Sequence, residues 1–81
     1  MKAVVVVRPK EGILDPQGQA VERSLRQLGF PVGEARVGRV IDLEVAAETP
    51  TAARGELERM CERLLANPLI ESYEIELSEE A

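Results

Sequence analysis

The sequence predicts an α+β sandwich in which two helices cover one face of a four-stranded antiparallel sheet. Strand-like and helix-like apolar spacings follow one another in the order strand, helix, strand, strand, helix, strand. Each helical stretch also begins with a capping residue and a proline, Asp15-Pro16 and Thr49-Pro50. Two right-handed split βαβ units in this order give a ferredoxin-like βαββαβ fold with strand order 4-1-3-2.

The first strand is expected at residues 3–7, where valines follow one another without interruption. Such a run is typical of a strand covered on both faces. Gly12 lies in the next loop, where it permits a positive φ. Asp15 then starts the first helix, and Gly29 is expected to stop it in a left-handed conformation. The apolar stripe of this helix consists of Val21, Leu25 and Leu28.

The second and third strands are expected at residues 32–37 and 40–46. A loop of three residues, 38–40, would pair Val37 with Ile41 and collect the apolar side chains of both strands on one face. A loop of two residues would separate them onto opposite faces, so the three-residue loop is favoured.

The second helix is expected to start at Thr49 and to stop before Pro68, which cannot continue a helix. A final strand at residues 73–77 alternates apolar side chains with glutamates. Residues 1–78 are therefore predicted to form a single domain, and residues 79–81 a frayed acidic end. The apolar stripe of the second helix consists of Ala53, Leu57, Met60, Cys61, Leu64 and Leu65.

Composition excludes several classes of function. The chain of 81 residues has a net charge of −5 and only two aromatic side chains, which argues against nucleic acid as a partner. Histidine is absent and Cys61 is the only cysteine, so neither a metal site nor a catalytic site is predicted. No signal peptide or long apolar run is present, which predicts a cytoplasmic protein with no membrane partner.

The outer face of the predicted sheet suggests self-association. Val4 and Val6 are expected there, in a central strand of a small domain that has little core of its own. A covered face, in a dimer at least, is the favoured interpretation; the alternative is that the two valines serve strand propensity alone. The acidic side chains expected on the same face are Asp42, Glu44, Glu74 and Glu76.

Six residues are candidates for partner docking. Their basic members would form a positive patch on an acidic protein, although ordinary solubility of loops and turns explains them as well. Asp15 is explained as a helix cap and would position the contact surface. Gly18 lies in the first helical turn, where glycine costs stability, so close approach of another backbone is expected. The basic candidates are Arg8, Lys10, Arg36 and Arg39.

Several short motifs also follow one another in a characteristic order along nearly the whole chain. They are Pro9-Lys10, Gly12-x-x-Asp15-Pro16-x-Gly18, Leu28-Gly29-Phe30, Val37-Gly38-Arg39, and Leu64-Leu65-Ala66-Asn67-Pro68 before Ile70-Glu71-Ser72-Tyr73. In this order and spacing they resemble PurS, the family of the smallest subunits of bacterial and archaeal phosphoribosylformylglycinamidine synthase. Arg39 stands where the PurS turn has lysine, which keeps the charge and changes its geometry.

The resemblance implies a non-catalytic subunit of a glutamine amidotransferase complex. In such a complex one subunit releases ammonia from glutamine, and a large synthetase uses ATP and Mg²⁺ to aminate formylglycinamide ribonucleotide. PurS-like chains dimerise and bridge these two subunits. The implied partners are therefore a second copy of this chain, the glutaminase subunit and the synthetase subunit, and no cofactor is implied for this chain itself.

Two other classes of function remain open. Sandwiches of this topology often bind small effectors at dimer interfaces, so a regulatory module is the main alternative, on fold analogy alone. A free-standing hydrolase or phosphatase is disfavoured because histidine and an anion-binding glycine loop are both missing.

Overall fold

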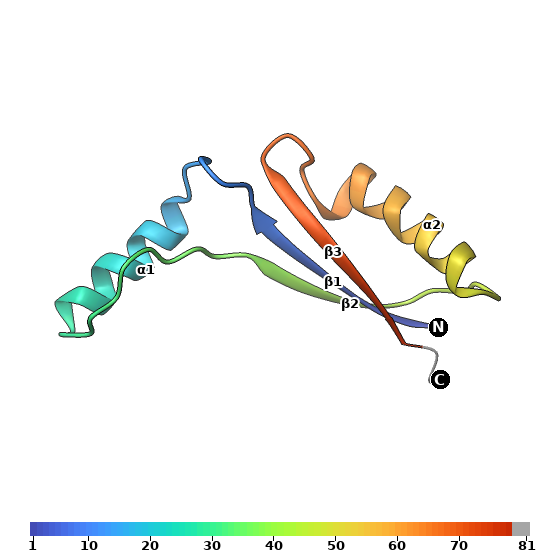
Figure 1. Ribbon diagram of the computed structural model, residues 1–81, viewed down its shortest axis with the longest axis horizontal. Helices are drawn as coiled ribbons and strands as arrows, with labels where there is room; N and C mark the ends of the chain where they lie inside the picture. The colour runs from blue at the N-terminus through green and yellow to red at the C-terminus, as the bar shows by residue number, and fades with distance from the viewer. Residues whose placement is uncertain (79–81) are drawn as a thin grey trace.

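The computed structural model describes residues 1–78. The frayed end predicted at residues 79–81 lies outside the described residues. A strand and a helix come first, then a second strand, a second helix with a π-helical last turn, and a third strand (Figure 1). These elements are β1 (Lys2–Pro9), α1 (Pro16–Gln27), β2 (Arg39–Glu44), α2 (Pro50–Met60), η1 (Cys61–Leu65) and β3 (Glu71–Ser78).

The sheet has three antiparallel strands in the order β2-β1-β3, among the described residues. The predicted four-stranded sheet is therefore wrong. Residues 32–37 run extended but pair with no strand, and β2 already begins at Arg39. The predicted hairpin with a loop at residues 38–40 is consequently absent, and Ile41 pairs with Val5 of β1 and not with Val37.

Side chains of the first helix explain why residues 32–37 do not join the sheet. Glu22 accepts a hydrogen bond from the amide of Ala35 at 2.9 Å, and Asp15 accepts one from the amide of Val37 at 2.8 Å. Gly38 then passes so close to β1 that a Cβ at this position would lie 2.2 Å from the Val7 carbonyl oxygen. The segment is thereby bound to α1 and enters β2 directly.

The prediction that both helices cover one sheet face is also wrong. Figure 1 shows α1 at the end of the molecule opposite α2, joined to the sheet by two crossings of the chain. The molecule measures 50 × 27 × 14 Å, and its radius of gyration of 15.9 Å exceeds the roughly 12 Å expected for a compact chain of this length. The stripe of α1 is therefore open, with Leu28 exposed to 74% and Val21 to 42%.

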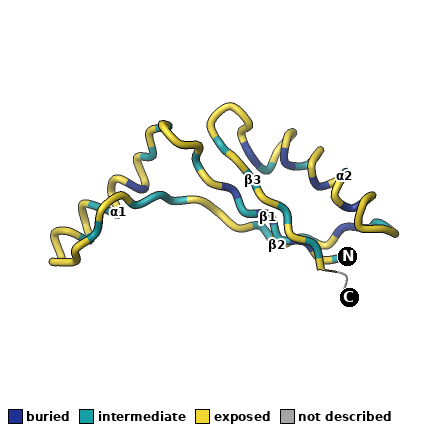
Figure 2. The backbone as a smooth tube through the Cα atoms, viewed as in Figure 1, coloured by how far each residue is buried: buried dark blue, intermediate teal, exposed yellow. Residues whose placement is uncertain are grey.

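The core lies between α2 and the sheet (Figure 2). Ala3, Val5 and Val7 of β1 are buried on this face, where Leu57 and Cys61 also have no exposed surface. The other face of β1 carries Val4 and Val6, which are half-buried. Their strand neighbours on that face include Asp42, Glu74 and Glu76, so the valines and carboxylates share the outer face as expected.

Candidate functional site

The candidate residues gather at the hinge between the sheet and the arm, the name used here for residues 11–38. Two crossings of the chain form this hinge, residues 10–15 on the way out and residues 36–39 on the way back. Gly12 has φ of +80° in the first crossing, as its position predicts. Four of the six candidates lie here; the exceptions are Gly18, in the first turn of α1, and Arg8, in β1.

Asp15 joins the two halves of the arm. One carboxylate oxygen accepts from the Gly18 amide at 3.0 Å, which caps α1, and the other accepts from the Val37 amide at 2.8 Å. These two hydrogen bonds, and the nearby Arg36 guanidinium, hold the pKa of Asp15 below its ordinary value. The predicted helix cap is confirmed, and the same side chain also fixes the returning strand-like segment.

Gly18 permits that segment to lie against the helix. A Cβ on this residue would stand 2.3 Å from the carbonyl oxygen of Ala35. Real side chains never approach backbone oxygen so closely, so the close backbone approach predicted from the glycine is confirmed.

Lys10 and Arg36 hold the first crossing. The Lys10 amide donates to the Ile70 carbonyl at 2.9 Å, and its ammonium donates to the Pro68 carbonyl at 2.6 Å. Arg36 donates through one terminal nitrogen to the Lys10 carbonyl at 2.8 Å, while its buried Nε has no hydrogen-bond partner among the described residues. Both side chains thus contact backbone carbonyls of their own chain.

Arg39 holds the second crossing. Its guanidinium binds the Glu71 carboxylate through two nitrogens, at 2.7 and 3.0 Å, and also donates to the Leu65 carbonyl at 2.5 Å. The Glu71 carboxylate accepts a further hydrogen bond from the backbone amide of Asn67 at 2.7 Å. The paired arginine, and then the amide, lower the pKa of Glu71.

Arg8 lies apart from this cluster, on the outer face of the sheet. It pairs with Glu74 at 3.3 Å, and both side chains are largely exposed. An exposed pair of this kind contributes little to stability, so Arg8 remains available to a partner. Partner docking by the six residues stays a prediction.

Sequence reasoning did not identify Glu22 and Glu71 as site residues. Glu22 binds the Ala35 amide and pairs with Arg26, which itself donates to the carbonyls of Val32 and Gly33. Nothing in the spacing of charges signals a carboxylate that binds a distant backbone amide. For Glu71 the available signals were its place in the Ile70-Glu71-Ser72-Tyr73 motif and the helix stop at Asn67-Pro68 shortly before it.

Other features offer little chemistry. Cys61 is buried, and burial raises the pKa of its thiol, as suits a core residue. The described residues hold no group of three or more acidic or thiol side chains that could bind a metal ion. Within the same part of the chain, no helix has the length and apolarity needed to cross a membrane.

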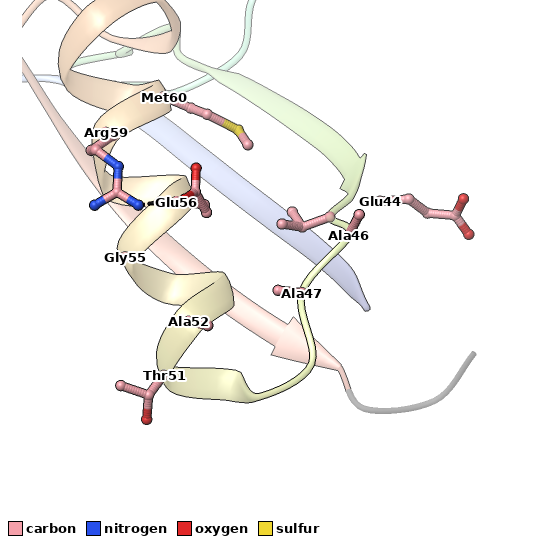
Figure 3. Close-up of a pocket in the computed structure, with 10 residues that line it drawn as sticks. Glu44, Ala46, Ala47, Thr51, Ala52, Gly55, Glu56, Arg59 and Met60 are labelled. Carbon is pink, nitrogen blue, oxygen red and sulfur yellow. Dashed lines mark hydrogen bonds and ion pairs between the residues drawn. The ribbon is translucent and has the colours of Figure 1, made fainter.

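A pocket of about 640 Å³ lies between α2 and the chain that follows β2 (Figure 3). Its wall is formed largely by small side chains, and its two charged helix residues, Glu56 and Arg59, pair with each other at 2.5 Å. Glu44 points away from the pocket in this view. The pocket therefore presents no converging polar groups of the kind that orient a small ligand.

Comparison with known proteins gives a consistent result. Residues 2–79 match a family model named PurS and described as phosphoribosylformylglycinamidine (FGAM) synthase. The phosphoribosylformylglycinamidine synthase subunit PurS of Methanocaldococcus jannaschii is 40% identical over 77 residues, which cover 94% of this chain and 93% of that protein. The Archaeoglobus fulgidus subunit of the same name is 41% identical over 76 residues, with 93% and 95% covered.

Solved structures resemble the whole chain. The crystal structure of M. jannaschii PurS, described as a subunit of formylglycinamide ribonucleotide amidotransferase in the purine biosynthetic pathway, has a TM-score of 0.85 at 38% identity and covers 99% of this chain and 98% of its own. A structure described as PurLQS from Thermotoga maritima has a TM-score of 0.84 at 39% identity, with 93% of both chains covered.

Proposed function

Because this chain belongs to the PurS family, we propose that it is the subunit that bridges the glutaminase and the synthetase of phosphoribosylformylglycinamidine synthase. Membership makes it a subunit of this ligase of purine biosynthesis. The proposal adds a non-catalytic role: the chain assembles the two active subunits and helps ammonia to pass between them. The T. maritima structure of PurLQS, which contains a similar chain, supports a place within such a complex.

The observation that carries the proposal is the arm. It projects from the sheet and exposes apolar side chains that a monomer would bury if they served its own core. The exposed apolar residues of the arm are Leu14, Val21, Leu28 and Phe30. Surfaces of this kind mark contact with another protein, and here they lie on an element that is separated from the sheet.

The proposal includes self-association, through the outer face of the sheet and through the exposed apolar side chains of the arm. The small core and the half-buried outer valines Val4 and Val6 favour a second copy of the chain, as the sequence predicts. A dimer would present two sheets and two arms on one rigid frame. Such a frame can hold two different subunits at a fixed distance.

Holding the glutaminase and the synthetase at a fixed distance would serve the transfer of ammonia between them. Ammonia becomes protonated in water near neutral pH and then loses its nucleophilicity, so shielding and proximity raise its effective concentration at the acceptor. ATP, Mg²⁺ and glutamine are assigned to the other two subunits, and no cofactor to this chain.

Size-exclusion chromatography with light-scattering detection tests the proposed bridging role. The glutaminase and synthetase are run together with and without this chain on a size-exclusion column. A species that contains all three, and that is missing when the chain is omitted, is expected. A complex of glutaminase and synthetase that forms equally well without the chain would contradict the bridging role.

A further inference from the structure

The loop between η1 and β3, residues 66–70, presents apolar side chains to the solvent. Leu69 at its tip is 82% exposed and Ile70 beside it 42%, and Leu64, near the end of η1, is 83% exposed. These residues belong to the last of the characteristic motifs of the sequence. Figure 1 shows the loop as an orange bend at the end of β3 that lies away from both chain termini. It is therefore an exposed apolar surface separate from the arm.

Asn67 organises this loop from within. Its backbone carbonyl accepts hydrogen bonds from the amides of Ile70 at 3.1 Å and Glu71 at 2.7 Å. Its side-chain oxygen accepts from the Leu69 amide at 3.2 Å, and its own amide donates to the Glu71 carboxylate at 2.7 Å. One asparagine thus closes the turn that carries Leu69, through its backbone and its side chain together.

Two cationic residues hold the same loop from outside. The Lys10 ammonium donates to the Pro68 carbonyl at 2.6 Å. The Arg39 guanidinium donates to the Leu65 carbonyl and binds the Glu71 carboxylate through two nitrogens. A loop that is already ordered in this way loses little conformational entropy when it binds, so its exposed side chains can act as preformed contacts.

Lys10 also brings a positive charge to the tip of the loop. Its ammonium is exposed and takes part in no ion pair in the part of the chain that the structure describes. The Glu71 carboxylate at the end of the loop is bound by Arg39 instead. The surface around Leu69 therefore combines apolar side chains with one fixed cation, on a chain whose net charge is −5. An apolar groove with a carboxylate at its rim would complement this surface.

A second copy of the chain is not the occupant that this surface favours. A two-fold contact between two such loops would bring two Lys10 ammonium groups together, which is repulsive. A contact between the loop and another face of a second copy would be head-to-tail and would continue into a ring or a filament. A different protein is the occupant that avoids both outcomes.

We propose that residues 66–70, here called the docking loop, bind one of the other two subunits of the synthase. Leu69 is the apolar anchor, with Leu64 and Ile70 beside it, and Lys10 is the charged contact. The partner surface is an apolar groove with a carboxylate at its rim. This inference rests on the proposed bridging function and places one of its contacts at the end of the sheet where β3 begins.

Binding of this chain to each subunit separately tests the docking loop. Immobilised glutaminase and immobilised synthetase are titrated in turn with the parent chain, Leu69→Asp and Lys10→Met. Leu69→Asp should weaken binding to one of the two subunits by about tenfold or more, because it places a carboxylate on the anchor. Lys10→Met should weaken the same binding and reduce its dependence on salt. Thermal melts and sedimentation of both variants should match those of the parent chain.

A matched control is Ala46→Asp, which adds the same carboxylate to an exposed position at the opposite end of the sheet. It should leave binding to both subunits unchanged. Undiminished binding of Leu69→Asp to both subunits would overturn the docking loop and leave the bridging function standing. Loss of self-association in Leu69→Asp would place a second copy on the loop and would also overturn the proposal. Failure of the parent chain to bind either subunit would overturn the bridging function and the docking loop together.

Discussion

The Asp15 carboxylate and the Val37 amide, 22 residues apart in the chain, are joined by a hydrogen bond of 2.8 Å. The other oxygen of the same carboxylate caps α1 at Gly18. One side chain therefore starts the helix and binds the segment that returns beside it. The arm is consequently a structured unit even though α1 does not pack on the sheet.

Substitution of Asp15 by alanine should release the returning segment as well as weaken the helix. The Val37 amide would lose its acceptor, and protection of this amide from hydrogen exchange should fall sharply. Exchange measured by nuclear magnetic resonance, together with a thermal melt, checks this.

The matched control is Thr49→Ala, which removes the other helix cap. The Thr49 hydroxyl accepts a hydrogen bond from the backbone amide of Ala52 in α2, so its loss should cost about 1 kcal/mol and leave the Val37 amide protected. Equal exchange of Val37 in both variants would show that Asp15 does not hold the segment.

Two glycines within helices should respond in opposite directions to alanine. Gly18→Ala is expected to destabilise the chain, because the new Cβ would stand 2.3 Å from the Ala35 carbonyl oxygen. Gly55→Ala, whose Cβ would meet nothing closer than 3.9 Å, should stabilise α2 by about 0.5–1 kcal/mol. Chemical denaturation of both variants measures the difference, and a stabilised Gly18→Ala would contradict the close approach.

Stability should fall in acid through two particular carboxylates. Folding lowers the pKa of both Asp15 and Glu71, so their contribution is fully present above their ordinary pKa values near pH 4. It is lost as the pH falls below that point through the lowered values. Melting temperatures between pH 2 and 7 should therefore drop more steeply for the parent chain than for Asp15→Asn with Glu71→Gln. Parallel curves would mean that other carboxylates are responsible.

The apolar surface of the arm should be required for self-association. Leu28→Asp places a charge on a side chain that is 74% exposed in the single chain, and it is expected to shift sedimentation toward the monomer. Arg23→Asp introduces the same acidic group outside the apolar stripe of α1 and makes the net charge even more negative. It should leave sedimentation unchanged. Dissociation by both variants would point to net charge instead of the apolar stripe.

Local signals in the sequence identified most elements. Asp15-Pro16 and Thr49-Pro50 start the two helices, and Gly29 has φ of +93° at the end of the first. Capping depends on residues next to one another in the chain, so it can be read from the sequence. The alternation of residues 73–77 likewise marks β3.

The error at residues 32–37 has a different origin. Their alternation is compatible with a strand, but pairing depends on which groups reach their backbone. Here Glu22 and Asp15 bind the amides of Ala35 and Val37. The basic candidates show the same limit, because Lys10, Arg36 and Arg39 bind carbonyls and a carboxylate that lie 26 to 58 residues away.

The bridging role is tested most directly by the rate of formylglycinamidine ribonucleotide synthesis by the glutaminase and synthetase, measured with and without this chain. The role predicts that the chain raises the glutamine-driven rate and leaves the rate driven by added ammonia nearly unchanged. Glutamine-driven synthesis that is equally fast without the chain would contradict it.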